Sequence, residues 1–227
     1  MISRIRKYSL NILINYLVLS FIWVLAYRYI DPPYTFLMLS RNLSSTKGSI
    51  SHSWVNEDAI SPYIKTCAMA SEDQNFPEHF GLDIDAIQKA VNFNTKHKRT
   101  RGASTITQQV AKNVFLWPGR SFMRKAFELQ FTLYIEFLWS KKRILEVYLN
   151  MIETGPMTFG LEAASQKYFK KHASKLNLTE SAQIISVLPS PLKWNPIHPG
   201  PFVYKRQKWI IQQFNMLGGL SYLNELD

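Results

Sequence analysis

The sequence predicts an all-α, mainly helical fold with little or no sheet and one membrane-spanning helix at the amino terminus. Apolar residues from Pro62 onward recur at helical spacing, whereas no run alternates between apolar and polar residues as a half-buried strand does. Hydroxyl residues stand just before several of these periodic segments, where their side chains can cap a helix. A long uncharged run near the amino terminus supplies the membrane-spanning element.

The amino-terminal run carries no charged residue between Lys7 and Arg28. Twenty residues in a helix span about 30 Å, the thickness of the hydrocarbon core of a bilayer. Arg4, Arg6 and Lys7 precede the run, so the positive-inside rule places the short tail in the cytoplasm and the rest of the chain outside. A cleaved signal peptide is the alternative, but this run is long and residues 25–28 make a poor cleavage site. We therefore expect an uncleaved anchor.

Three parts follow from this pattern. Residues 1–30 form the cytoplasmic tail and the transmembrane anchor. Residues 31–60 mix Pro, Ser, Asn and Gly with scattered apolar residues, which is typical of a connector. Residues 61–227 form one domain, long enough to bury a core of its own.

Helices in the first half of this domain are predicted from periodicity and capping residues. Apolar positions 84, 87, 90 and 91 share one face of a helix that ends near Asn94. Thr105 and Gln108 have the spacing of a capping box, so a helix should begin at Thr105 and run to about Val114. The sequence Trp-Pro-Gly at 117–119 then breaks it.

Later helices are predicted in the same way. Ser121 caps a long helix through Trp139, and Ser140 caps the next. A helix should cover residues 161–169, and Thr179 should open another through Leu188. Five prolines between 189 and 201 define an irregular segment, and a final amphipathic helix begins near Val203 and ends before the glycines at 218–219.

The composition limits the classes of partner. The chain holds 27 Lys and Arg against 16 Asp and Glu, a net charge of +11, which favours an anionic partner such as nucleic acid, anionic lipid or a phosphorylated substrate. Cys67 is the only cysteine, so it forms no intramolecular disulfide, and we expect a small core residue there. The five histidines lack the spacing of metal ligands.

The segment 71–81 gathers acids, an imidazole and apolar bulk. Glu72 is followed by Phe76, Pro77 and Phe80, which would partly desolvate its carboxyl group and raise the pKa toward neutrality, as suits a general base or acid. The alternative for Glu72 is a surface acid at a helix end.

Two further segments carry groups that suit an anionic or sugar ligand. Residues 102–115 are rich in hydroxyls and amides and contain a single cation, Lys112. Ser104, Thr105, Gln108 and Gln109 offer uncharged donors for sugar hydroxyls and phosphate oxygens. Arg124 and Glu128 are four residues apart on one helix face; they form either an exposed ion pair or a phosphate-binding cation beside a reactive carboxylate.

Five ordered motifs now give a resemblance that covers roughly residues 62–200. They are E-D-x-x-F-x-x-H-x-G at 72–81, G-A-S-T-I-T-Q-Q-x-x-K-N at 102–113, R-K-x-x-E at 124–128, R-I-L-E-x-Y-L-N at 143–150, and the Ala-Ala and Tyr-Phe pairs of 163–169. In this order they resemble the peptidoglycan glycosyltransferases of glycosyltransferase family 51. The short length and single anchor are similar to the monofunctional, biosynthetic form.

The resemblance implies a fold and roles for residues. The fold is a helical, lysozyme-like lobe with a small hydrophobic jaw at the membrane, and residues 61–227 are the glycosyltransferase domain. Glu72 matches the catalytic carboxylate that deprotonates the acceptor 4-hydroxyl. Glu128 matches the second acid, which assists at the leaving diphosphate, with a divalent cation (Mg or Mn) as one option and no cofactor as the other. The substrate-binding matches are Ser104, Thr105, Gln109, Lys112 and Arg124.

The implied activity is polymerisation of lipid II into β-1,4 glycan strands, with inversion at the anomeric carbon and release of polyprenyl diphosphate. The implied partners are lipid II, the nascent glycan strand and the membrane, with division or elongation proteins as further candidates and no nucleic acid. The implied location is the bacterial inner membrane, with a single pass and the catalytic domain on the periplasmic side.

Some features depart from the family pattern or stay open. Residues 150–157 and the bulky run 131–134 are less typical of the family. These departures affect the expected local packing and leave Glu72 and Glu128 untouched. The residues around the break at 118–119, from Phe115 to Met123, fit a core and a lipid interface equally well. The basic loop 96–101 is either solvated surface or a site for anionic headgroups.

Two other functions compete with this hypothesis. A wall-degrading hydrolase also uses a catalytic Glu on a helical fold, but it would not need Lys112 and Arg124 aligned for a diphosphate. A membrane-anchored binding protein would use the positive charge alone, and no nucleic-acid-binding motif supports it.

Overall fold

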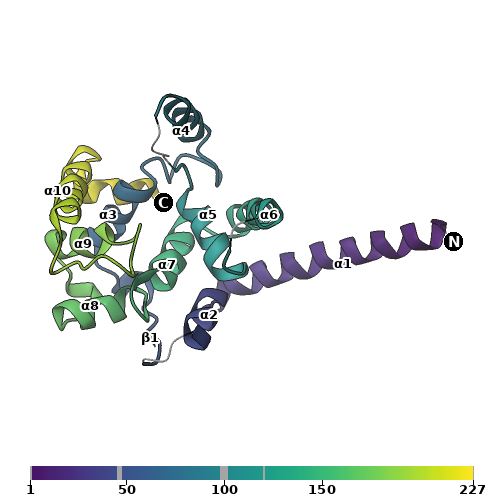
Figure 1. The fold of residues 1–227 in the computed structure, drawn as a ribbon, viewed down its shortest axis with the longest axis horizontal. Coiled ribbons are helices and arrows are strands. Elements are labelled where there is room, and N and C mark those ends of the chain that lie inside the picture. Colours follow the sequence, from purple (N-terminus) through teal and green to yellow (C-terminus); the bar gives the residue numbers. More distant parts are fainter. Residues whose placement is uncertain (1, 45–47, 98–101, 120, 227) are drawn as a thin grey trace.

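The computed structural model describes residues 2–44, 48–97, 102–119 and 121–226 (Figure 1). The fold is mainly helical, as predicted. Helix α1 (Ile2–Tyr29) projects from the folded body as a single rod (Figure 1). Its segment Arg6–Tyr29, with a mean hydropathy of 1.9, is long and apolar enough to cross a membrane.

The carboxyl-terminal half of α1 packs against helix α6 (Phe122–Leu138). The Gln130 amide joins the two helices, because it accepts a hydrogen bond from the Tyr16 hydroxyl at 2.9 Å and donates one to the Ser20 hydroxyl at 3.0 Å. Nearer the body, the indole N–H of Trp139 donates to the Val24 carbonyl at 2.9 Å. Helix α1 is therefore fixed to the folded body along its side as well as through the chain.

Arg143 of helix α7 (Lys141–Met151) fixes the end of α1. Its guanidinium donates to the carbonyls of Tyr27 and Ile30 at 3.0 and 3.1 Å and pairs with Asp31 at 2.9 Å. Cations at the carboxyl end of a helix satisfy carbonyls that lack intrahelical partners. This arginine of the fourth motif thus connects the end of α1 to α7.

The segment 31–60 is folded onto the domain. It contains α2 (Phe36–Ser44), strand β1 (Ser51–His52) and the short 3-10 helix η1 (Glu57–Ala59). Arg41 of α2 makes two hydrogen bonds to the Glu153 carboxylate, at 2.8 and 2.9 Å. The Asn150 amide bonds both the N–H and the carbonyl of Val55, each at 2.9 Å.

Among the described residues the sheet is small, as the prediction of little or no sheet allows. Strands β2 (Glu153–Gly155) and β3 (Thr158–Phe159) are antiparallel, and β1 pairs with β3 in parallel, giving the order β1-β3-β2. Strands of two or three residues are too short to produce an alternating pattern, so the sequence gives no sign of them.

The largest helical packing lies on the side of the body away from α1 (Figure 1). Helix α3 (Pro62–Glu72) packs against α9 (Leu178–Ser186), α10 (Pro201–Met216) and the 3-10 helix η4 (Gly219–Leu226). Helix α8 (Leu161–Phe169) and the 3-10 helix η3 (Ala173–Lys175) complete this side. Cys67 of α3 is buried in this core, and burial raises the pKa of its thiol to about 12, which confirms the expected structural role.

Three helix starts were predicted correctly. Helix α5 (Ile106–Val110) begins at the Thr105–Gln108 capping box and continues as a π-helical turn, η2 (Ala111–Phe115). The Ser121 side chain caps α6 by accepting from the backbone N–H of Arg124. The Ser140 side chain caps α7 by accepting from the backbone N–H of Arg143. Helix α4 (Ile84–Lys96), which is capped by Asp83, stands apart from the other helices (Figure 1).

The predicted start of α9 at Thr179 is wrong. The N-cap is Asn177, whose side chain accepts from the Glu180 N–H while the Glu180 carboxylate accepts from the Asn177 N–H. This pair forms a capping box as effectively as a hydroxyl residue does. Helix α10 begins at Pro201, two residues before the prediction, because proline lacks an N–H and fits the first turn.

Substitution of Gly81 tests the close packing between α6 and the turn that follows α3. Its φ is +77°, and a Cβ there would lie 2.7 Å from the Thr132 methyl and 2.9 Å from Glu136 Cγ, both on α6. We expect Gly81→Ala to lower the free energy of unfolding by about 2 kcal/mol or more, because strain and overpacking add. Denaturation followed by circular dichroism in detergent measures this. Gly200→Ala is the matched control, since no described atom lies within 4 Å of its added Cβ; equal stability of the two variants would contradict the packing described.

Candidate active site

Glu72 is the last residue of α3, and its carboxylate is held from three sides. One oxygen accepts hydrogen bonds from the Ser71 hydroxyl and from an Arg206 Nη, each at 3.0 Å. The other accepts from the Gln109 amide at 3.3 Å. The side chain is 16% exposed, so Glu72 is oriented but still open to a ligand. It is therefore not a freely solvated acid at a helix end.

Asp73 brings the first two motifs together. One of its carboxylate oxygens accepts from the Ile106 N–H at 2.9 Å, and the other pairs with His79 Nε2 at 2.9 Å. The N–H at the start of a helix lacks an intrahelical partner, and a carboxylate there is also favoured by the helix dipole. Asp73 thus fixes the start of α5 beside the end of α3, which places Gln109 against Glu72.

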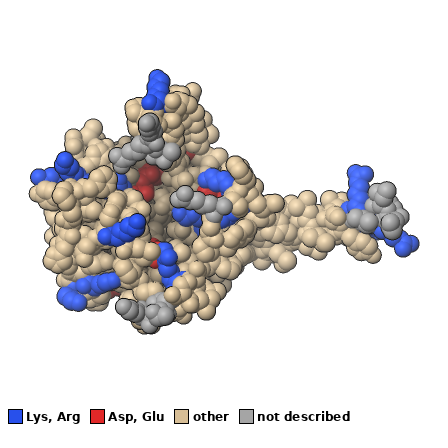
Figure 2. Space-filling view, in the orientation of Figure 1, with Lys and Arg blue, Asp and Glu red and all other residues tan. Residues whose placement is uncertain are grey.

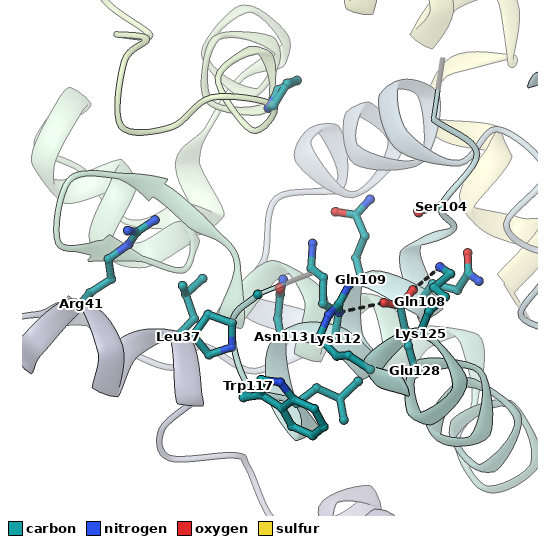
Figure 3. A pocket seen from close by; sticks show the side chains of 15 residues that line it. Leu37, Arg41, Ser104, Gln108, Gln109, Lys112, Asn113, Trp117, Lys125 and Glu128 are labelled. Atoms are coloured by element: carbon teal, nitrogen blue, oxygen red, sulfur yellow. Dashed lines mark hydrogen bonds and ion pairs between the residues drawn. The ribbon is translucent and has the colours of Figure 1, made fainter. Parts of the chain in front are cut away.

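Glu128 lies on α6 with its carboxylate between two cations. Arg124 Nη1 is 3.0 Å from one oxygen, and Lys125 Nζ pairs with the other (Figure 3). The Glu128 and Arg124 side chains are only 4% and 11% exposed, so the alternative of an exposed ion pair is wrong. Arg124 Nε is buried and makes no hydrogen bond to the described residues. A buried guanidinium nitrogen without a partner is costly, and an anionic ligand in this cavity would supply an acceptor for it.

Lys112 projects from the π-helical turn on the same side as Gln109 (Figure 3). It opens to the cavity, yet the protein around it removes enough hydration to lower the pKa of its ammonium group. Arg124 and Lys125 lower it further by repulsion, while Glu128 and, more weakly, Glu72 act in the opposite sense. Three cations therefore surround one carboxylate, which leaves an excess of positive charge.

Two adjoining cavities contain these groups. The first, of about 640 Å³, is lined by the charged residues Lys112, Arg124, Lys125 and Glu128 and by apolar ones that include Leu37, Leu116 and Trp117. The second, of about 800 Å³, is lined by residues that include Glu72, Asp73, Arg206 and Trp209. Both have the size of ligand sites. They share Ser104, Gln109 and Pro189, so they meet between Glu72 and Glu128.

Figure 2 shows the surface around this region. Lys and Arg side chains gather around a hollow in the middle of the body, and acidic atoms are visible within it (Figure 2). The cationic part of the site, where Lys112, Arg124 and Lys125 line the first cavity, would attract an anionic ligand over a distance.

The predicted site residues lie together around the two cavities. However, the Thr105 hydroxyl and the Gln108 amide make hydrogen bonds within the fold. The Thr105 hydroxyl donates to the Gly81 carbonyl at 2.7 Å and accepts from the Gln108 N–H at 3.2 Å. The Gln108 amide oxygen accepts from the Thr105 N–H at 3.1 Å. Ser104, Gln109, Lys112 and Arg124 line the first cavity, and Thr105 contributes to the wall of the second.

Several residues that line these cavities were not assigned from the sequence, among them Lys125, Arg41, Arg206 and Trp209. Lys125 was visible as the second residue of the third motif. Arg41 and Trp209 lie outside the motifs. Arg206 contacts Glu72 across 134 residues of chain, and no local pattern predicts a contact at that separation.

Of the residues around the break at 118–119, some are core and others are surface. Phe115 and Leu116 are buried, whereas Phe122 and Met123 are 98% and 65% exposed. The core interpretation is thus confirmed for Phe115 and Leu116, and contact of the exposed residues with lipid stays a prediction. Residues 98–101 of the basic loop lie outside the described residues.

A resident divalent cation does not fit the donors around Glu128. Both carboxylate oxygens accept from Arg124 and Lys125, and a third cation, Lys112, lines the same cavity. Among the described residues, no group of three His, Cys, Asp or Glu side chains could hold a metal ion. The charge of this site is already positive, so it suits an anion.

Known proteins are similar to this chain over most of its length. A family model described as transglycosylase matches residues 40–215. The chain is 44% identical to a biosynthetic peptidoglycan transglycosylase of Cronobacter sakazakii, over 97% of this chain and 93% of the relative. It is 45% identical to a protein of the same description from Pseudomonas aeruginosa, over 95% of this chain and 94% of the relative. For another from Xanthomonas campestris the identity is 46%, over 90% and 85%.

The pKa of Lys112 predicts how anion binding should depend on pH. Because that pKa lies below 10.5, the ammonium group becomes neutral at a lower pH than in free lysine. We expect the affinity for inorganic pyrophosphate to fall as the pH rises through this lowered pKa, since the neutral amine no longer attracts the anion. Isothermal titration over an alkaline pH series measures the decline. Lys112→Arg keeps its charge and should retain its affinity over the same series; an identical decline in both proteins would assign the effect to another group.

Proposed function

Because the chain belongs to the transglycosylase family, we propose that it polymerises lipid II into the glycan strands of peptidoglycan and releases polyprenyl diphosphate. The single observation that carries the site assignment is the meeting of two cavities between Glu72 and the cluster of Lys112, Arg124 and Lys125. One cavity presents a carboxylate, and the other presents cations.

Glu72 is the general base of the proposed reaction. It accepts the proton of the acceptor 4-hydroxyl, and the oxygen attacks the anomeric carbon of the donor sugar from the side opposite the diphosphate. The new C–O bond forms as the bond to the phosphate oxygen breaks, so the configuration inverts and the electron pair leaves with the diphosphate. The contacts from Arg206 and Gln109 support this role because they fix the carboxylate orientation.

The three cations bind the leaving diphosphate. Charge grows on the phosphate oxygens as the bond breaks, and fixed positive groups in a partly dry site stabilise that charge. Glu128 holds Arg124 and Lys125 in place and limits their mutual repulsion. Ser104 and Gln109, which line both cavities, are positioned to contact the sugars on either side of the bond being made.

The polyprenyl chain of the donor leaves the first cavity along its apolar wall. Leu37, Leu116 and Trp117 form that wall beside the cations. On α6, Leu133 and Phe137 are 43% and 72% exposed, and this helix packs along α1. An apolar surface next to a membrane-spanning helix supports contact with lipid. A wall-degrading hydrolase acts on a polymer without diphosphate and has no use for this arrangement.

We propose that residues 1–30 anchor the protein in the bacterial inner membrane with a single pass. Residues 31–60 connect the anchor to the catalytic domain, residues 61–227, and are folded against it. Arg4 and Arg6 at the amino-terminal end of α1 support a cytoplasmic tail and a periplasmic domain. Division or elongation proteins are the candidate protein partners.

Substitution of Glu72 tests the reaction. We expect Glu72→Gln to reduce polymerisation at least about a hundredfold, because the amide cannot accept the hydroxyl proton. The measurement is formation of glycan from labelled lipid II in detergent. Glu78→Gln is the matched control, since Glu78 is an exposed acid in the same motif and outside both cavities. Polymer from the Glu72→Gln protein at the wild-type rate would overturn the assignment. Shortening of preformed glycan, with no polymer from any variant, would favour the hydrolase.

The proposed orientation is tested by protease protection. In sealed right-side-out membrane vesicles we expect external protease to digest the domain and to leave only the anchor. In inverted vesicles the domain should survive until detergent is added. Protection in right-side-out vesicles would place the domain in the cytoplasm and contradict the proposal.

A further inference from the structure

The second cavity extends beyond Glu72 to a surface of α10 that the proposed reaction does not use. Trp209 lies there, one helical turn after Arg206, and is 39% exposed. Gln74 and Gln213 line the same part of the cavity. None of these three residues belongs to the groups assigned to the base or to the diphosphate.

Trp209 is connected to Glu72 through a single residue. The Arg206 guanidinium carbon lies 5.7 Å from the centre of the indole ring, and the same guanidinium bonds Glu72 and Ser71 at 3.0 and 2.8 Å. A cation over an aromatic face is held by the ring quadrupole. A ligand that rests on Trp209 therefore lies next to the group that orients the base.

Two amide side chains, those of Gln74 and Gln213, line the same cavity as the indole. The Gln74 amide donates to the Gln213 amide at 2.8 Å across an exposed surface. Amides supply both donors and acceptors, as required by hydroxyl and N-acetyl groups. A half-exposed indole with amides in the same cavity fits a ring that is apolar on its flat side and polar at its rim, which describes a pyranose.

We propose that Trp209 is a stacking platform for an N-acetylhexosamine ring of the bound glycan, next to the ring that reacts at Glu72. This subsite rests on the proposed function, since it takes the same sugars. Occupation of the platform also keeps Arg206 against Glu72, so the subsite affects turnover as well as binding.

A binding experiment tests the platform without the polymerisation reaction. The full-length protein is labelled with 5-fluorotryptophan in detergent, and the resonance missing from Trp209→Phe is assigned to Trp209. A soluble tetramer of β-1,4-linked N-acetylglucosamine should shift that resonance. The Trp194 resonance, assigned in the same way, should not move, because Trp194 lies outside both cavities. An unmoved Trp209 resonance at saturating tetramer would overturn the proposal.

Variants then separate stacking from a structural role. Trp209→Ala should weaken tetramer binding about tenfold, the loss expected for one aromatic contact, and Trp209→Tyr should restore most of it. In the lipid II assay, Trp209→Ala should raise KM, lower kcat and shorten the glycan strands. Tyr204→Ala is the matched control, since Tyr204 is an exposed aromatic residue on the same helix and outside the cavity.

The outcomes distinguish this proposal from the proposed function. If the wild type binds the tetramer through Trp209 but makes no polymer, the subsite stands and the polymerase assignment fails. If the wild type makes polymer and Trp209→Ala matches it in tetramer affinity, KM and strand length, the subsite is refuted. A Trp209→Ala protein that fails to fold leaves the fluorine measurement on the wild type as the deciding result.

Discussion

The carboxylate of Asp73 is the contact on which the geometry of the site depends. It accepts from the first N–H of α5 and pairs with His79, so one side chain fixes a helix start to the turn after α3. Without it, the helix that carries Gln109 and Lys112 would lose its fixed position relative to Glu72. Because Asp73 is 6% exposed, removal of its charge would also leave buried donors without partners.

Charge is divided between the two cavities in a way that suits group transfer. The first cavity, proposed for the donor, concentrates positive charge, with a single carboxylate that holds two of the cations in place. The second cavity, proposed for the acceptor, presents a carboxylate held by Arg206 and Gln109. Glu72, the proposed proton acceptor, and the cations proposed to stabilise the developing negative charge thus lie in different cavities. Ser104 and Gln109 line both cavities, and in the proposed reaction the reacting atoms would meet beside them.

Local features of this fold could be predicted from the sequence, while long-range ones could not. The caps at Thr105, Ser121 and Ser140 depend on residues three apart, and that pattern is visible in the chain. Ordered motifs identified the site residues that line the first cavity. Arg206 was missed because its contact with Glu72 is set by the packing of α10 on α3, which no neighbouring residue encodes. The start of α9 was missed because Asn177 and Thr179, which stand two positions apart, can both cap a helix. In the structure, Asn177 is the N-cap and forms the capping box with Glu180.

The fixed connection between α1 and α6 has a consequence for how substrate arrives. Gln130 and Trp139 hold α6 along α1, the helix proposed to span the bilayer, so the proposed anchor and α6 form one unit. Helix α6 carries exposed apolar side chains, and its residues Arg124, Lys125 and Glu128 line the cationic cavity. In the proposed reaction, a polyprenyl-linked substrate would therefore reach this cavity by lateral diffusion within one leaflet. Encounter becomes a search in two dimensions, and its rate is set by the surface density of substrate in the membrane instead of its bulk concentration.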